Sequence, residues 1–452
     1  MKIIIVGDGK VGYTLSENLS REGHDITIID NQKHVLKKSI EALDVIAITG
    51  NGASYAIQNE AGVSSADLLI AATSMDEVNM ICCLIAKKLG AKNTIARIRN
   101  PEYNEQLSLM KEEMGLSMVV NPELAAATEI FRLISFPSAI SIGTFSKSKV
   151  FLIEYKVEEG NPLAGTAISG LHGKQSSKIL ICAVARGQEI YIPKGNFVIQ
   201  AGDNIHIAGT HRNISEFLQS LGQRDKKIKS AMIVGGGLIT FYLSKMLIDH
   251  GIQIKIVEKK ESKCGQLCES LPEALIIYGD GTDKNLMDAE GLMYTDAFIA
   301  LTDIDEENLI MSLYAAYQNV PKVITKINRL EYANVIKKAG VDRVISPKHI
   351  AANDIVRYVR SMETPGFGDI KTLYRIIGRQ VEMLEFLATA NTRHLNTPLA
   401  KLPLKKDILI TAIVRGGHVI IPKGKDSMQE NDTVIVVTAK RQLDHLNQIF
   451  SD

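Results

Sequence analysis

The chain contains one sequence pattern twice. Ile4-Ile5-Val6-Gly7-Asp8-Gly9 is matched by Met232-Ile233-Val234-Gly235-Gly236-Gly237, so position 7 corresponds to position 235, an offset of 228. Gly50-Asn51-Gly52 returns as Gly279-Asp280-Gly281, and Ile192-Pro193-Lys194-Gly195 returns as Ile421-Pro422-Lys423-Gly424, both at an offset of 229. Matches at a nearly constant offset indicate a tandem duplication of a unit of about 225 residues. The 452-residue chain must therefore build the same architecture twice.

Each copy opens with alternating strand and helix signals. The strand signals are short apolar runs rich in Ile and Val: Ile3–Val6, Ile26–Ile29, Val45–Ile48, Leu68–Ala72, Thr94–Ile98 and Met118–Val120. They show little polar alternation, which is typical of strands buried on both faces of a parallel sheet. Asn100-Pro101-Glu102 and Asn121-Pro122-Glu123 each combine a capping Asn, a Pro at the first helical position and an early acid. The pattern predicts a Rossmann-like, doubly wound α/β domain.

The last part of each copy has a different sequence pattern. Short strand signals such as Phe151–Val157 and Ile179–Ala185 are separated by turn clusters such as Gly160-Asn161-Pro162, which predicts a small α+β module. We therefore expect an α/β protein with four domains in tandem. These are a Rossmann-like domain at 1–140, a small module at 141–222, a second Rossmann-like domain at 228–362 and a second module at 363–452.

The glycine turn of the first copy predicts a nucleotide site. Gly7-Asp8-Gly9-Lys10-Val11-Gly12 follows an apolar strand and opens a helix, and Asp30 ends the next strand. Gly7 allows the tight turn, Gly9 lets a pyrophosphate approach the backbone, and Gly12 lets the helix pack on the sheet. Phosphates then meet the helix N-terminus. Asp30 accepts hydrogen bonds from ribose hydroxyls and repels a 2′-phosphate, which favours NAD or adenosine over NADP.

The second copy keeps this arrangement with changes. Its turn is Gly235-Gly236-Gly237-Leu238-Ile239-Thr240, and Glu258 takes the place of Asp30. A β-branched Thr240 at the close-packing position is expected to displace the helix. We expect nucleotide binding here too, weaker or for another nucleotide.

Further candidate contacts follow the other strands, because ligands of doubly wound sheets bind beyond the carboxyl ends of strands. For the first copy they are Asn51, Gly52, Thr73, Ser74 and Arg97. Their counterparts in the second copy are Asp280, Gly281, Thr302 and Lys326. Arg97 can reach a phosphate or form an ordinary salt bridge.

Composition and motifs exclude several function classes. There is no Ser elbow, CxxC or HExxH, so neither a catalytic residue nor a metal site is predicted, and we expect a protein that is not an enzyme. Cys264 and Cys268 stand at helical spacing and are expected on a buried helix face. With 52 basic and 51 acidic residues, the chain lacks the positive surplus of nucleic-acid binders. No apolar run approaches the roughly 18 residues of a membrane span, so we expect a cytoplasmic protein that reaches the membrane through a partner.

The whole chain resembles the TrkA-type regulatory subunits of potassium-uptake systems, which are built from regulator of potassium conductance (RCK) domains. The resemblance rests on the glycine turn with Asp30, on Thr73-Ser74-Met75-Asp76-Glu77, on Ala96-Arg97-Ile98-Arg99 and on the repeated Ile-Pro-Lys-Gly turn. It implies that the matching residues bind NAD or NADH, or alternatively ATP or ADP. It also implies a ring-forming homo-oligomer, a dimer or tetramer, on the inner face of the membrane. The implied partner is a potassium-translocating integral membrane subunit, similar to TrkH or TrkG.

Two other functions compete with this one. The same fold could regulate another channel or exchanger in response to nucleotide. An NAD-dependent dehydrogenase would need a substrate domain with a proton-transfer residue near the nicotinamide, and the small modules offer no such acid/base cluster. The residues leave open which nucleotide each copy takes, which one activates, whether the second copy binds at all, and what the modules do.

Overall fold

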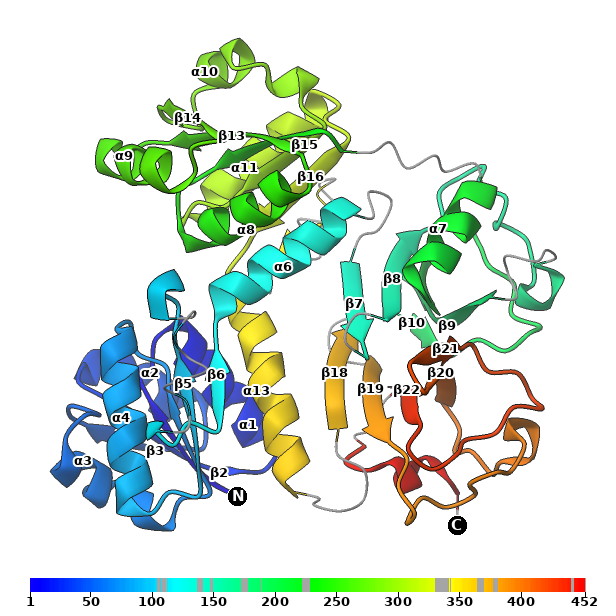
Figure 1. The fold of residues 1–452 in the computed structure, drawn as a ribbon, viewed down its shortest axis with the longest axis horizontal. Helices are drawn as coiled ribbons and strands as arrows, with labels where there is room; N and C mark the ends of the chain where they lie inside the picture. The colour runs from blue at the N-terminus through cyan, green and yellow to red at the C-terminus, as the bar shows by residue number, and fades with distance from the viewer. Residues whose placement is uncertain are drawn as a thin grey trace. The chain divides into compact units, whose positions relative to one another are not determined.

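The structure is a computed structural model (Figure 1). It describes residues 1–103, 106, 111, 113–135, 141–146, 149–171, 178–187, 189–221, 228–329, 341, 343–363, 370–376, 381–439 and 443–451. The chain divides into two compact units. One combines Met1–Phe131 with Lys229–Val356 and contains both Rossmann-like domains. The other combines Arg132–Ile228 with Arg357–Asp452 and contains both small modules.

The first Rossmann-like domain is a six-stranded parallel sheet in the order β3-β2-β1-β4-β5-β6. Its strands are β1 (Lys2–Val6), β2 (Asp25–Asp30), β3 (Ile46–Thr49), β4 (Leu68–Ala71), β5 (Asn93–Arg97) and β6 (Met118–Val120). Its helices are α1 (Lys10–Arg21), α2 (Lys33–Ala42), α3 (Tyr55–Glu60), η1 (Val63–Ser65), α4 (Asp76–Leu89) and α6 (Pro122–Ser135). The strand order reverses between β1 and β4, which is where a doubly wound sheet opens its ligand crevice.

The second domain repeats this topology as β14-β13-β12-β15-β16-β17. Its strands are β12 (Ser230–Val234), β13 (Gln253–Glu258), β14 (Leu275–Tyr278), β15 (Ala297–Ala300), β16 (Lys322–Lys326) and β17 (Val344–Ile345). Its helices are α8 (Leu238–Asp249), α9 (Glu261–Ser270), α10 (Lys284–Ala289), η4 (Leu292–Tyr294), α11 (Asp305–Tyr317) and α13 (Pro347–Glu363). The predicted fold class, a duplicated doubly wound α/β domain, is confirmed.

The central strands explain why the apolar runs were informative. Ile3, Ile4 and Ile5 of β1 are all fully buried, as are all four residues of β15. Consecutive strand residues point to opposite faces, so burial of every one requires cover on both faces of the sheet. The helices on either face provide that cover.

The small modules are antiparallel, with strand orders β10-β9-β11-β8-β7 and β18-β19-β22-β20-β21. The first contains β7 (Ser141–Phe145), β8 (Val150–Lys156), η2 (Ile168–Gly170), β9 (Ile179–Arg186), β10 (Glu189–Tyr191), β11 (Asn204–Gly209) and α7 (His211–Ser220). The second contains β18 (Ile370–Ile376), β19 (Val381–Leu387), η6 (Leu399–Lys401), β20 (Ile408–Arg415), β21 (His418–Ile420), β22 (Thr433–Ala439) and η7 (Leu446–Ile449).

The two modules share one hydrophobic core. Val150 and Leu152 of β8 pack in the same buried cluster as Met383 of β19 and Val437 of β22. The duplicated modules thus bury apolar faces against each other, which neither short sheet could cover alone.

One expectation about the helices is wrong. Cys264 of α9 is buried, but Cys268 is exposed. The buried face of this segment runs through Cys264, Leu267 and Leu271, at spacings of three and then four residues. Cys268 falls one position beyond Leu267, which turns it by about 100° toward solvent. Cysteine spacing alone did not distinguish these two neighbouring positions.

Candidate nucleotide-binding site

Both Rossmann-like domains line a single cleft of about 1120 Å³. The first copy contributes Gly7, Gly9, Lys10, Val11, Asp30, Asn51, Gly52, Thr73, Ser74 and Arg97 to the lining. The second contributes Gly235, Gly236, Gly237, Leu238, Ile239, Glu258, Asp280, Gly281, Thr302 and Lys326. In the sequence these residues form two separate groups, one in each copy. The structure brings them to one cavity at the carboxyl ends of the strands.

The first glycine turn requires glycine at positions 7 and 12. Gly7 has a φ of +95°, and its amide donates to the carbonyl of Ile29 at 2.8 Å. A Cβ on Gly12 would lie 1.8 Å from the Gly7 carbonyl oxygen, so no side chain fits there without movement of the turn. A Cβ on Gly9 would meet nothing within 4 Å. The turn therefore leaves open space at the start of α1, where a phosphate can approach backbone amides.

The strand-end carboxylates hold the glycine turns in place. Asp30 accepts the backbone N–H of Asp8 at 2.7 Å and that of Gln32 at 2.8 Å. Glu258 does the same with the N–H groups of Gly236 at 2.6 Å and Lys260 at 2.8 Å. Each carboxylate oxygen can accept more than one hydrogen bond, so both acids retain capacity for ribose hydroxyls. Glu258 thus occupies the structural role of Asp30 despite its longer side chain.

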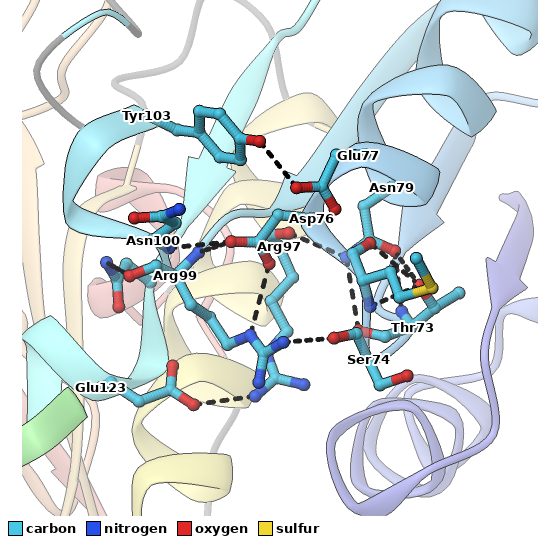
Figure 2. A network of polar contacts seen from close by, with 12 residues as sticks. Thr73, Ser74, Asp76, Glu77, Asn79, Arg97, Arg99, Asn100, Tyr103 and Glu123 are labelled. Carbon is cyan, nitrogen blue, oxygen red and sulfur yellow. Dashed lines mark hydrogen bonds and ion pairs between the residues drawn. The ribbon is translucent and has the colours of Figure 1, made fainter. Parts of the chain in front are cut away.

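A buried asparagine in each copy fixes the loops after the fourth and fifth strands, and Figure 2 shows the one in the first copy. Asn79 of α4 accepts from the Thr73 hydroxyl at 2.7 Å and donates to the Arg97 carbonyl at 2.8 Å. In the second copy Asn308 of α11 accepts from Thr302 at 2.9 Å and donates to the Lys326 carbonyl at 3.0 Å. Both asparagines are fully buried.

Sequence reasoning missed Asn79 and Asn308. The signal that could have found them is the repeat itself, because the two stand 229 positions apart, the offset of the flanking motifs.

Arg97 lines the cleft in an ion pair (Figure 2). Its guanidinium donates to Glu123 of α6 at 2.9 Å, and both side chains are largely buried. Burial lowers the pKa of Arg97, while the Glu123 charge acts in the opposite direction. Glu123 was missed as a site residue, because Asn121-Pro122-Glu123 was interpreted only as a helix start.

Arg99, beside it, bridges the Ser74 carbonyl and the Asp76 carboxylate. Figure 2 shows the Arg99 guanidinium against Ser74 and the Arg97 guanidinium against Glu123.

The second copy differs in charge at the same place. Asp303 stands where the first copy has Ser74, and it accepts from Lys326 at 3.0 Å. The Lys326 charge, followed by smaller contributions from Lys263 and Lys10, lowers the pKa of Asp303. Lys10 belongs to the first glycine turn, so the charges of the two copies act on each other within the cleft.

Three predicted residues lie behind the lining. Gly12 packs against Gly7, as described above. Thr240 is buried, and its hydroxyl donates to the Gly235 carbonyl. Asp8 is also buried, and one of its carboxylate oxygens accepts from the Ser39 hydroxyl of α2 at 2.6 Å.

The buried Asp8 carboxyl predicts a pH-dependent stability. Desolvation raises its pKa from 3.8 to about 6, assisted by the Asp30 charge and opposed by Ser39 and Lys38. The folded state therefore holds this proton more tightly than the unfolded state, so the group destabilises the fold as pH rises from about 4 to 6, by about 3 kcal/mol when complete.

Asp8→Asn should accordingly raise the free energy of unfolding by up to about 3 kcal/mol at pH 7.5 and by about half as much at pH 5. Urea unfolding at both pH values measures this. Asp44→Asn, at an exposed position, is the control and should show no such gain. An equal gain for Asp8→Asn at both pH values would exclude ionisation as its cause.

Within the described part of the chain, no cluster of three or more His, Cys, Asp or Glu side chains could hold a metal ion. Among the same residues, no helix is both long and apolar enough to cross a membrane.

Fold and cleft together define a paired Rossmann-like nucleotide-binding module. The sequence also matches models of known protein domains. The TrkA-N domain model matches residues 3–122 and 231–347, and the TrkA-C domain model matches residues 152–222 and 383–451. The chain belongs to the TrkA family of potassium-uptake proteins.

Relatives match over the full length. The Trk system potassium uptake protein TrkA homolog of Archaeoglobus fulgidus is 34% identical, and homolog 1 of Methanosarcina mazei is 33% identical, each with 100% of both chains covered. TrkA of Haemophilus influenzae is 30% identical over all of this chain and 98% of its own.

Solved structures show the same fold. The crystal structure of the GsuK RCK domain has a TM-score of 0.65 at 18% identity, covering 97% of this chain and 92% of that one. The GsuK channel bound to NAD has a TM-score of 0.64 at 18% identity, covering 97% of this chain and 76% of that one.

Proposed function

We propose that this chain is the nucleotide-binding regulatory subunit of a potassium-uptake system, and that it gates a potassium-translocating membrane subunit. One observation carries the proposal: two complete sets of glycine turn, strand-end acid and basic strand end face one cleft. Full-length relatives named for potassium uptake support the transport role. We expect the chain to act without catalysing a reaction.

The ligands are NAD(H) or an adenine nucleotide such as ATP or ADP. Asp30 and Glu258 suit ribose hydroxyls, and each glycine turn suits a pyrophosphate. A similar fold has been solved with NAD and with ADP. A cleft of about 1120 Å³ exceeds the range of about 300–1,000 Å³ typical of single-ligand sites, which supports two ligands side by side.

Gating requires that the nucleotide bind two states of the assembly with different affinity. A ligand held between two domains meets this requirement, because a change in the spacing of the domains changes its contacts on both sides. We propose that the chains form a ring at the inner face of the membrane and pass this change to a TrkH- or TrkG-like subunit. The small modules are proposed to hold the assembly together through buried cores like the one that joins them here.

Asp30→Ala tests the ligand assignment. Removing the carboxylate deletes the ribose acceptor and frees the N–H groups that position the turn, so affinity at the first copy should fall about 10- to 100-fold. Calorimetric titration with NADH, NAD, ATP and ADP measures this. Asp25→Ala, at the exposed opposite end of β2, is the matched control and should bind normally. Binding of none of these nucleotides by the wild-type protein would refute the proposal.

Potassium uptake tests the partner. Cells deprived of this gene, with no second copy in the genome, should grow poorly at limiting potassium, and wild-type protein should restore growth better than Asp30→Ala. Normal uptake without the gene would instead favour regulation of another channel or exchanger.

A further inference from the structure

A tyrosine hydroxyl connects the two copies next to their nucleotide sites. Tyr242 lies on α8, one turn after the second glycine turn, and its side chain is buried. Its hydroxyl donates to the carbonyl of Arg99 at 2.7 Å and accepts from the side-chain amide of Asn121 at 3.1 Å. Burial is the main cause that raises the pKa of Tyr242, so the hydroxyl keeps its proton and serves as both donor and acceptor.

The groups that Tyr242 contacts belong to the first nucleotide site. The backbone N–H of Arg99 donates to Asp76 at 2.7 Å, and the Arg99 side chain reaches the Ser74 carbonyl in the cleft lining (Figure 2). Asn121 caps α6 by accepting the N–H of Leu124 at 2.9 Å. The start of α6 carries Glu123, the partner of Arg97. One hydroxyl thus touches both the loop and the helix start that position the basic groups of the first site.

The corresponding residues of the other copy make different contacts. The counterpart of Tyr242 is Thr14, whose hydroxyl donates to a carbonyl one turn earlier in its own helix, at 2.9 Å. The counterpart of Arg99 is Asn328, whose backbone and side-chain N–H groups both donate to Asp305. The side chains at these duplicated positions have therefore diverged, and Thr14 and Asn328 each make these hydrogen bonds within their own copy.

We infer that Tyr242 couples the two nucleotide sites, so that a ligand on the second glycine turn alters affinity at the first. The inference rests on the proposed nucleotide binding. A phosphate at the N-terminus of α8 acts on the helix that carries the hydroxyl, and displacement of α8 lengthens or breaks the contacts with Arg99 and Asn121. By reciprocity, a ligand at the first site changes affinity at the second by the same factor.

The coupling factor is measurable with NADH and ADP as probes. Two variants, Asp30→Ala and Glu258→Ala, each weaken one site, and titration of each gives the association constant of the other site. The coupling factor is the product of the two association constants of the wild-type protein divided by the product of these two single-site constants. A value away from 1 reports coupling. We expect a factor of about fivefold or more in the wild type, and less than about twofold when Tyr242→Phe is added to all three proteins.

Tyr242→Phe removes only the oxygen and keeps the buried ring. Asn121→Ser is a second variant that keeps a capping hydroxyl but shortens the reach to Tyr242, and it should reduce the factor in the same direction. Tyr317→Phe, at an exposed position on α11, is the matched control and should leave the factor unchanged.

Several results would overturn the inference. These are a wild-type factor of 1, an unchanged factor in Tyr242→Phe, or a loss of single-site affinity in Tyr242→Phe as large as the change in coupling, which would indicate a merely structural role. Absence of any nucleotide binding by the wild-type protein is a different outcome, because it refutes the proposed function itself.

Discussion

Gly12→Thr should strongly reduce the nucleotide affinity of the first copy. A Cβ at this position would lie 1.8 Å from the Gly7 carbonyl oxygen and 2.9 Å from its carbonyl carbon, and both atoms are backbone. The turn must open to relieve the clash, at a cost of about 1–3 kcal/mol typical of overpacking. Opening also moves the amides that face the phosphates, so affinity at this site should fall at least about 100-fold. Calorimetric titration of the Glu258→Ala background isolates the first site.

The second copy offers a matched control for this substitution. Thr240 already occupies the corresponding position, and its hydroxyl contacts the Gly235 carbonyl, so the second turn is built to hold it. Thr240→Gly removes a hydrogen bond and adds backbone freedom, which should cost only about 1–2 kcal/mol in stability. Second-site affinity should change less than tenfold. If Gly12→Thr and Thr240→Gly changed affinity at their own sites by the same factor, the steric fit at this position would not control binding.

The sequence predicted the fold well because the signals for it are local. A run such as Ile3–Val6 is buried in every position, and a parallel strand covered on both faces has few other ways to appear in sequence. Gly7 and Gly12 are likewise dictated by backbone geometry within one turn. The duplication supplied each of these signals twice.

The site was predicted less completely, because part of it depends on contacts between distant segments. The Arg97–Glu123 pair and the Tyr242–Arg99 contact join residues that are 26 and 143 positions apart. No local pattern distinguishes a Glu in the first turn of a helix from one that also pairs with a cleft arginine. The common cleft also depends on how the two copies pack, and this is set by side-chain complementarity instead of periodicity.

Divergence between the copies gives the cleft two unlike halves. The first has Ser74 beside Arg97, while the second has Asp303 beside Lys326. A carboxylate beside the cleft-lining lysine would oppose an anionic ligand there. This charge difference supports the expectation that the second site is weaker or takes a different nucleotide, and it makes Asp303→Ser the natural variant for comparing the two halves.

Arg360→Met should strongly destabilise the second small module. Arg360, near the end of α13, is 2% exposed and pairs with Glu382 of β19 at 3.0 Å and 3.3 Å. Loss of the guanidinium removes a close counter-charge from a buried carboxylate, and breaking a buried pair in this way typically costs about 3–5 kcal/mol. Chemical unfolding followed by tyrosine fluorescence measures the loss.

The double variant Arg360→Met with Glu382→Leu should recover most of the lost stability, because an apolar pair of similar volume avoids the desolvation penalty of both charges. If the double variant were as unstable as the single one, packing at α13 would matter more than charge.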